Sequence, residues 1–200
     1  MYRLFDSAIS GNAYKVRLML HKLDLPFERI EMDVDDGSTR EAEFLARNPV
    51  GQVPVLQLLD GAYLAQSDAI LVYLAEGTRF WPQERLARAQ ALQWMFFEQY
   101  NHEPTIAVVR HWVAHLGKTA ASEPALPAKI AGGYRALGIM ETHLAKRDFF
   151  VGDSLSVADI ALYAYTHVAH EGGFDLGDYP ALRAWLGRVA SDPRHIAITD

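Results

Sequence analysis

The 200-residue sequence contains no cysteine. Without thiols the chain forms neither disulfides nor zinc–thiolate sites, and it has no thiol of its own for redox or nucleophilic chemistry. The absence of cysteine also fits a reducing compartment, and we expect the protein to be cytoplasmic. Any thiol chemistry that involves this protein must therefore use a sulfur atom that a ligand supplies.

Long apolar runs and an excess of positive charge are also missing. No window approaches the roughly 18 consecutive apolar residues that a membrane-spanning helix needs, and Asp6 interrupts the stretch where a signal peptide would be apolar. Lys and Arg number 19 against 25 Asp and Glu, so the net charge is -6 and no basic stripe exists to neutralise phosphates. We therefore expect neither a membrane nor a nucleic acid as a partner.

Hydrophobic residues make up 50% and charged residues 22% of the chain, a composition typical of globular proteins. The first part alternates short apolar runs with amphipathic stretches, which is typical of βα units. This pattern predicts strands over residues 2–5, 27–34, 53–58 and 62–65, and helices over 13–23, 41–47 and 66–76. The order β-α-β-α-β-β-α is that of a thioredoxin-like α/β domain, which we assign to residues 1–78.

After Trp81-Pro82 the alternating strand pattern does not return, and the sequence predicts only helices. The expected helices cover about 83–116, 128–146, a segment that begins at Ser156, and 180–191. Ser156 and Asp159 have the spacing of a capping box, in which each side chain bonds the backbone amide of the other. We assign residues 84–200 to an all-α domain.

Three segments of the first domain carry a family resemblance. Residues 10–18 read SGNAYKVRL, residues 48–56 read NPVGQVPVL, and residues 66–74 read QSDAILVYL. In this order and at these separations they resemble the cytosolic glutathione transferases of the serine type, and the resemblance covers residues 1–76. The helical half is similar in its layout and its capping box. The resemblance implies a glutathione-binding domain, an all-helical domain that forms the acceptor pocket, and a homodimer.

Ser10 is the catalytic residue that the resemblance implies. The thiol of glutathione has an unperturbed pKa near that of cysteine, about 8.5, so only a few per cent of it is thiolate at neutral pH. A Ser10 hydroxyl that donates to the sulfur, beside the N-terminus of the first helix, would stabilise the anion. Asn12 is a second candidate donor. Capping of that helix is the alternative role for either residue.

The other two motifs are expected to hold the rest of glutathione. The resemblance implies a cis bond at Val53-Pro54, with the Val53 backbone paired antiparallel to the cysteinyl residue of the ligand. Gln66 and Ser67 begin a helix whose free amides attract the γ-glutamyl carboxylate. A plain helix cap is the alternative role for Ser67.

The two ends of the tripeptide have further candidate partners. Gln66 stands where many relatives carry an acid, so Asp68, or an acid of a second subunit such as Glu103, is a candidate for the glutamyl ammonium. Gln52 and Arg40 are candidates for the glycyl end. A simple surface charge is the alternative for Arg40.

The resemblance also implies an acceptor pocket between the two domains. Its candidate lining residues are Ile9, Tyr100, Glu103 and Arg110. Core packing is the alternative for Tyr100, and charge pairing within the helix is the alternative for Glu103 and Arg110.

The sequence favours no metal site. His111 and His115 are spaced by four residues and His167 and His170 by three, but neither pair belongs to the HExxH pattern of zinc enzymes. We expect exposed or interface histidines and no metal cofactor.

We therefore predict an enzyme, a glutathione transferase that binds reduced glutathione and activates its thiol for conjugation to a small hydrophobic electrophile, as in detoxification. A glutathione-dependent disulfide or peroxide reductase would use the same site. A transferase-like module that binds ligands or partners without catalysis is the alternative from another class. Ser10, Val53-Pro54 and Ser67 favour the enzyme, whereas Gln66 in place of an acid keeps the noncatalytic alternative open.

Overall fold

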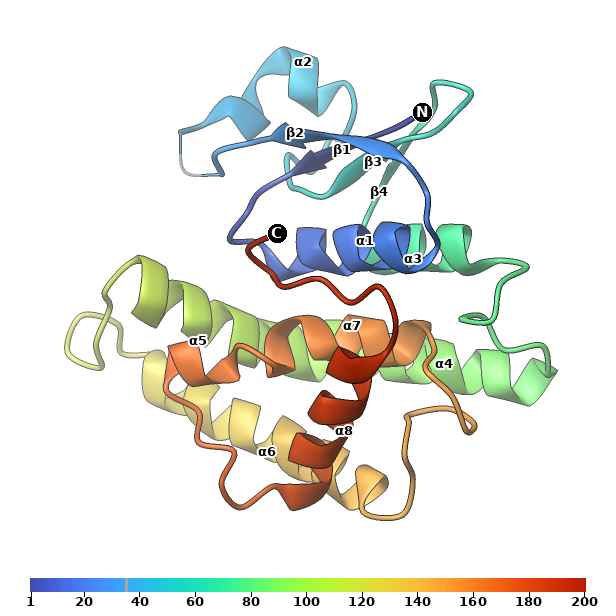
Figure 1. Ribbon diagram of the computed structural model, residues 1–200. Helices are drawn as coiled ribbons and strands as arrows, with labels where there is room; N and C mark the ends of the chain where they lie inside the picture. Colours follow the sequence, from blue (N-terminus) through green and yellow to red (C-terminus); the bar gives the residue numbers. More distant parts are fainter. Residues whose placement is uncertain (35) are drawn as a thin grey trace. The chain divides into compact units, whose positions relative to one another are not determined.

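The computed structural model describes residues 1–34 and 36–200, and these divide into two compact units (Figure 1). The first unit comprises Met1–Thr78 together with Pro193–Asp200, and the second comprises Arg79–Asp192. The segment Pro193–Asp200 therefore differs from the predicted boundary, which assigned it to the helical domain. Pro193 cannot continue the last helix, and carbonyls beyond it accept hydrogen bonds from side chains of the first unit.

A four-stranded sheet forms the centre of the first unit. Its strands are β1 (Tyr2–Asp6), β2 (Phe27–Glu31), β3 (Val55–Gln57) and β4 (Tyr63–Ala65), in the order β2-β1-β3-β4. β1 pairs parallel with β2 and antiparallel with β3, and β4 pairs antiparallel with β3. Parallel strands need a crossover, which α1 (Gly11–Lys22) supplies between β1 and β2. The predicted thioredoxin-like order is confirmed, with β2 and β3 shorter than the sequence indicates.

Helices cover both faces of this sheet. The other helical elements of the first unit are η1 (Ser38–Arg40, a 3₁₀ turn), α2 (Ala42–Leu45) and α3 (Ser67–Ala75). α1 and α3 lie side by side on one face, and α2 lies on the other (Figure 1). Alternate residues of β1 serve the two faces, because Phe5 packs with Phe44 of α2 whereas Leu4 is fully buried on the opposite side.

The second unit is built from helices, as the sequence predicts. They are α4 (Arg85–Phe97), η2 (Glu98–Ala107), α5 (Val108–Arg110), η3 (His111–His115), α6 (Leu126–Leu144), α7 (Val157–Thr166), η4 (Ala169–Gly172, a 3₁₀ turn) and α8 (Pro180–Ser191). Residues 85–115 are continuously helical, but η2 and η3 have π-type turns where a regular helix is expected. Pro104 lies inside η2, where it has no amide hydrogen and crowds the preceding turn, so regular α spacing is lost around it. Within the described residues, no helix combines the length and the apolarity needed to cross a bilayer.

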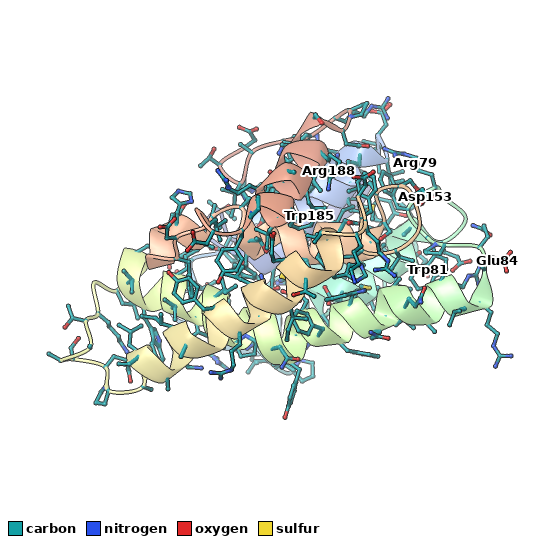
Figure 2. All side chains as sticks on the ribbon, turned by 90° about the horizontal axis from the view of Figure 1, so that it is seen from below. Arg79, Trp81, Glu84, Asp153, Trp185 and Arg188 are labelled. Atoms are coloured by element: carbon teal, nitrogen blue, oxygen red, sulfur yellow. The ribbon has the colours of Figure 1, made fainter. Side chains whose placement is uncertain are left out.

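α7 forms the buried centre of the second unit, since every one of its residues is shielded from solvent. Ser156 and Asp159 form the predicted capping box at its start. The Asp159 carboxylate also accepts from the amide of Phe150 at 3.0 Å and from the indole of Trp185 at 2.9 Å, a residue of α8 labelled in Figure 2. Burial raises the pKa of Asp159, and these donors oppose the rise because they favour the charged form.

We expect Asp159→Asn to lower the free energy of unfolding by about 3 kcal/mol, because an amide leaves part of this buried donor set without an acceptor. Chemical denaturation followed by circular dichroism measures the change. Asp153→Asn is the matched control, since Asp153 is exposed in the preceding loop and its replacement should cost less than about 0.5 kcal/mol. Equal stability of the two variants would contradict this role of the Asp159 carboxylate.

Candidate functional site

Ser10 lies where the chain passes from β1 into α1. It is the N-cap residue of α1: its Oγ accepts from the amide of Ala13 at 3.2 Å, and its own amide donates to Ser7 O at 2.9 Å. Among the described residues, no acceptor receives a hydrogen bond from the Ser10 hydroxyl group. Its hydrogen therefore remains available to a ligand. The half-buried Ser10 side chain therefore caps the helix and keeps a donor free, and the two roles that the sequence left open are compatible.

A polar network joins the start of α1 to the start of α3. The Ser67 hydroxyl donates to Asn12 Oδ1 at 3.2 Å and accepts from Lys15 Nζ at 3.4 Å. Lys15 Nζ also lies 3.1 Å from Oδ1 of Asp68. Asn12 is therefore a link between two helices and not the cap of α1. Because the network brings two helix N-termini together, an anion at this position meets free amides and the positive ends of two helix dipoles.

Lys15 is the member of this network that the sequence patterns did not single out. Its side chain is 0% exposed, although lysine is among the residue types least often buried. A signal was present, because Lys15 precedes the apolar Leu18 and Met19 by three and four residues and so lies on an apolar helix face. Lys15 pairs with Oδ1 of Asp68, whereas Oδ2 of Asp68 has no hydrogen-bond partner among the described residues, so a contact of Asp68 with a ligand ammonium stays a prediction.

Gln66 precedes α3 with a backbone φ of 70°, a left-handed conformation that is uncommon for residues other than glycine. Strained backbone of this kind is concentrated at functional sites, where the surrounding structure enforces it. The Gln66 side chain is exposed beside the first amides of α3, which have no partner within the helix. The residue therefore belongs to the candidate anion site.

The loop before β3 is fixed by Asn48 and by a close backbone approach. Asn48 donates from Nδ2 to Gln52 O at 2.8 Å and accepts from Val50 N at 3.1 Å. Gly51 has a φ of 68°, and a Cβ at this position would lie 2.8 Å from Thr39 O. Both facts require glycine, so the loop holds one backbone conformation.

The predicted ligand-holding residues of the same region lie close together. The Val53-Pro54 bond is cis, which confirms the isomer that the resemblance implies. Gln52 and Arg40 are both exposed. Arg40 is more than an isolated surface charge, because its Nη1 donates to Val50 O at 3.1 Å and ties η1 to the loop.

The candidate residues for an acceptor pocket fall in both units. Ile9 belongs to the first unit, whereas Tyr100, Glu103 and Arg110 belong to the second. Tyr100 is 84% exposed, so core packing is wrong for this residue. Arg110 is buried, and its Nε lies 2.7 Å from Oε2 of Glu171, so this ion-pair partner belongs to η4 and not to the helix of Arg110. Ile9 and Glu103 are half-buried.

The two histidine pairs lie on partly exposed turns of the second unit. The ring centroids of His111 and His115 are 5.8 Å apart, and His167 Nδ1 is 2.9 Å from Tyr163 O in the preceding turn. Across residues 1–34 and 36–200, no three His, Cys, Asp or Glu side chains are grouped closely enough to hold a metal ion.

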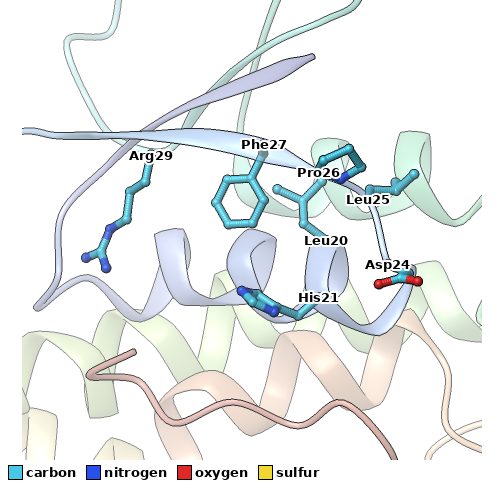
Figure 3. Close-up of a pocket in the computed structure, with 7 residues that line it drawn as sticks. All are labelled: Leu20, His21, Asp24, Leu25, Pro26, Phe27 and Arg29. Carbon is cyan, nitrogen blue, oxygen red and sulfur yellow. The ribbon is translucent and has the colours of Figure 1, made fainter.

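An open depression of about 630 Å³ lies at the opposite end of α1 from Ser10 (Figure 3). Arg29 and Asp24, which contribute to its lining, are already ion-paired. At about 1.5 Å of rise per residue, His21 in this lining is about 16 Å from Ser10 along the helix. The depression is therefore separate from the candidate site.

Comparison with known proteins bears on both units. The family described as "Glutathione S-transferase, N-terminal domain" matches residues 9–76, and the one described as "Glutathione S-transferase, C-terminal domain" matches residues 94–193. The solved glutathione S-transferase of Pseudomonas fluorescens is 48% identical to this chain, with a TM-score of 0.97 over 100% of this chain and 99% of that one.

More distant relatives have other names. The disulfide-bond oxidoreductase YfcG of Escherichia coli is 28% identical over 197 residues, which cover 93% of this chain and 89% of the relative. The yeast protein Ure2p, solved in complex with glutathione, is 25% identical with a TM-score of 0.87, over 96% of this chain and 90% of that one. With both domain families matched and a near-identical fold among solved transferases, this chain belongs to the glutathione S-transferase family.

Proposed function

We propose that the protein is a glutathione transferase in which Ser10 activates the thiol of bound glutathione as a thiolate. The observation that carries this proposal is the Ser10 hydroxyl hydrogen, which bonds no acceptor among the described residues and lies at the start of α1. A serine that caps a helix through its oxygen can donate its hydrogen at the same time. The amide of Ala13 and the helix dipole both strengthen that donation.

The free energy that thiolate formation requires is small enough for this site to supply. Lowering a thiol pKa from about 8.5 by about 2 units needs a preference of about 2.7 kcal/mol for the anion. One hydrogen bond to a charged group contributes about 1.5–3 kcal/mol, and a helix N-terminus adds about 0.3–1 kcal/mol. Ser10 and α1 therefore suffice without a protein base, and the rest of catalysis comes from proximity.

The start of α3 holds the glutamyl end of the ligand in this proposal. The γ-glutamyl carboxylate bonds the Ser67 hydroxyl and the free amides of the first turn, with the Gln66 side chain beside it. Lys15 stands behind Ser67 and supplies a positive charge, since its Nζ is 3.4 Å from the Ser67 oxygen. Asn12 accepts the Ser67 hydrogen until the ligand carboxylate replaces it.

The loop before β3 holds the rest of the tripeptide. The amide and carbonyl of Val53, which precedes Pro54, pair with the cysteinyl backbone as one residue of added strand. Gln52 of this loop and Arg40 of η1, which donates to Val50 O of the loop, take the glycyl carboxylate.

The reaction needs only one bond-forming step on sulfur. The thiol loses its proton to solvent, and the thiolate forms a bond to an electrophilic carbon while the leaving group departs with the bonding electrons. We assign Ile9, Glu103 and Arg110 to the contacts with the electrophile, and we assign the exposed Tyr100 to the subunit interface proposed below. This is the chemistry by which a cytoplasmic transferase detoxifies small hydrophobic compounds.

A glutathione-dependent reductase is the second candidate, and the similarity to YfcG favours it. Since the chain has no cysteine, this reaction would use two glutathione molecules. The bound thiolate attacks one sulfur of a disulfide and releases the other as a thiolate, and the thiol of a second glutathione then resolves the mixed disulfide to oxidised glutathione. A hydroperoxide would be reduced by the same two thiols to an alcohol and water, or hydrogen peroxide to two waters, with oxidised glutathione as the other product.

We expect Ser10→Ala to lower kcat/KM at pH 7 by about 30-fold, because the thiolate fraction returns to a few per cent when the bound thiol loses its donor. A chloronitroaromatic acceptor reports conjugation, and a small disulfide assayed in parallel reports reduction. Ser10→Thr, which keeps the hydroxyl, should stay within about threefold of the wild type. Wild-type conjugation at pH 7 in Ser10→Ala would overturn the role of Ser10, and faster turnover of the disulfide would favour the reductase.

We expect Ser67→Ala to raise the dissociation constant of glutathione by about tenfold or more, because the ligand carboxylate loses a hydrogen bond. Isothermal titration calorimetry measures this constant directly. Ser122→Ala is the control, since Ser122 is exposed in the second unit. Unchanged affinity in Ser67→Ala would remove the start of α3 from the binding site.

We also propose a homodimer, with Phe96 and Tyr100 in its interface. These side chains are 69% and 84% exposed and are four residues apart in the helical segment 85–115, so they form an apolar face. Sedimentation equilibrium is expected to give a dimer for the wild type and a monomer for Phe96→Glu, because a charge cannot be buried there without a partner. A wild-type monomer at micromolar concentration would contradict this proposal.

A further inference from the structure

A buried ion cluster lies directly behind the loop that carries Ser10. Asp6, the last residue of β1, is 0% exposed. Nη1 of Arg17 contacts both of its carboxylate oxygens, at 2.6 and 2.7 Å, and Nε of Arg29 lies 2.7 Å from Oδ2. Arg17 itself is 1% exposed. The cluster therefore fixes the point at which the chain leaves the sheet and enters the loop 7–10.

A second arm of the cluster reaches the middle of this loop. Nη2 of Arg29 lies 2.9 Å from Oε2 of Glu31, and Oε1 of Glu31 accepts from the backbone amide of Ala8 at 2.7 Å. The amide of Ser10 then closes the loop on Ser7 O at 2.9 Å. The loop is consequently anchored at its entry, at its middle and at its end.

The C-terminal segment Pro193–Asp200 completes the cluster from outside, beside α1 (Figure 1). Three carbonyls accept from side chains of the first unit: Ile196 O from the Tyr14 hydroxyl at 2.7 Å, Ile198 O from Nη2 of Arg17 at 2.6 Å, and Asp200 O from Nη1 of Arg29 at 3.1 Å. The last of these acceptors lies beyond a turn, which the amide of Asp200 closes on Ala197 O at 3.2 Å. Tyr14 and Arg17 lie in the first two turns of α1, which begins immediately after Ser10.

Stability alone does not account for this arrangement. The buried guanidinium of Arg17 and the buried carboxylate of Asp6 lose much of their hydration, and the Arg29 side chain beside them is only 29% exposed. Apolar side chains of similar size commonly stabilise a core as well as or better than such a group of charges. What the charged cluster adds is a fixed geometry, because the planar guanidinium of Arg17 donates from Nη1 to both oxygens of Asp6 and from Nη2 to Ile198 O, and both donors lie in one plane. The cluster holds the loop 7–10, which ends at Ser10, in that geometry.

On the basis of the proposed transferase function, we propose that Arg17 is a positioning residue, which acts together with Asp6 and the segment Pro193–Asp200 to hold the Ser10 hydroxyl against the sulfur of glutathione. The segment is held through its backbone carbonyls. Its release would let the start of α1 and the loop 7–10 move together. A shift of about 1 Å at a reacting group lowers rates by as much as about 100-fold, so small movements of the loop matter.

Two variants test the positioning role, one with a larger and one with a smaller change in the contacts of α1. Arg17→Lys keeps the positive charge beside Asp6 but cannot bond both the carboxylate and Ile198 O. Tyr14→Phe is the milder change, which removes the hydroxyl that donates to Ile196 O. Arg3→Lys is the matched control, because Arg3 is an exposed residue of β1 that pairs with Glu28 at 2.8 Å. Thermal unfolding confirms that each variant is folded, and Tyr14→Phe continues the test if Arg17→Lys is not.

The readouts are the pH profile of kcat for a chloronitroaromatic acceptor and the dissociation constant of glutathione. For Arg17→Lys we expect the midpoint of the profile to move up by about one pH unit, so that kcat at pH 7 falls about threefold and returns to within about twofold of the wild type at pH 9. For Tyr14→Phe we expect the midpoint of the kcat profile to move in the same direction by about one third of a pH unit. The dissociation constant should change less than about threefold in both variants, because the start of α3 is untouched.

A loss of kcat by the same factor at every pH would overturn the proposal, because it is the result of a smaller folded fraction. A wild-type profile in both variants would overturn it as well. A failure of the proposed transferase function gives a different result. In that case the pH profiles of kcat for the wild type and Ser10→Ala would have the same midpoint. If these two differ and Arg17→Lys and Tyr14→Phe match the wild type, only the positioning role is lost.

Discussion

Two helices of the first unit begin side by side, and the rest of the site depends on that packing. α1 and α3 share one face of the sheet, and Ser67 joins their starts through its bonds with Asn12 and Lys15. Neighbouring helix N-termini concentrate positive potential in one place. Asp68 supplies a negative charge there, but the Lys15 ammonium balances it, so the position still favours an added anion. A ligand with a thiolate and carboxylates matches such a field, which links the fold of this family to the binding of glutathione.

Structure that depends on local spacing could be predicted from the sequence, and contacts between distant residues could not. The four strands, the helix α1 and the capping box at Ser156 all follow from patterns within a few residues. The bond between Lys15 and Asp68 joins positions 53 residues apart, and the one between Trp185 and Asp159 joins positions 26 apart, so no local pattern contains them. The grouping of the segment Pro193–Asp200 with the first unit could not be predicted for the same reason. Its bonds use backbone carbonyls, which leave no trace in the side-chain pattern.

The absence of cysteine gives the sulfur of the ligand its central place. Conjugation and disulfide reduction both begin with the same bound thiolate, and they differ in whether that sulfur attacks carbon or sulfur. The first unit supplies the features that both reactions need: a free hydroxyl donor at Ser10 and an anion site at the start of α3. The choice between the reactions therefore depends on the residues that contact the acceptor. The shared requirement is a lowered thiol pKa, and Ser10 is the residue on which that requirement rests.

The most direct measurement of this claim is the ultraviolet absorbance of the thiolate while glutathione is titrated into the wild type and into Ser10→Ala across a range of pH. The chain has no cysteine of its own, so the signal comes from the ligand alone. The account predicts a bound thiol whose pKa is about 2 units below that of free glutathione in the wild type, and a return to the free value in the variant while binding persists. Binding to the wild type without any change in the thiol pKa would contradict it.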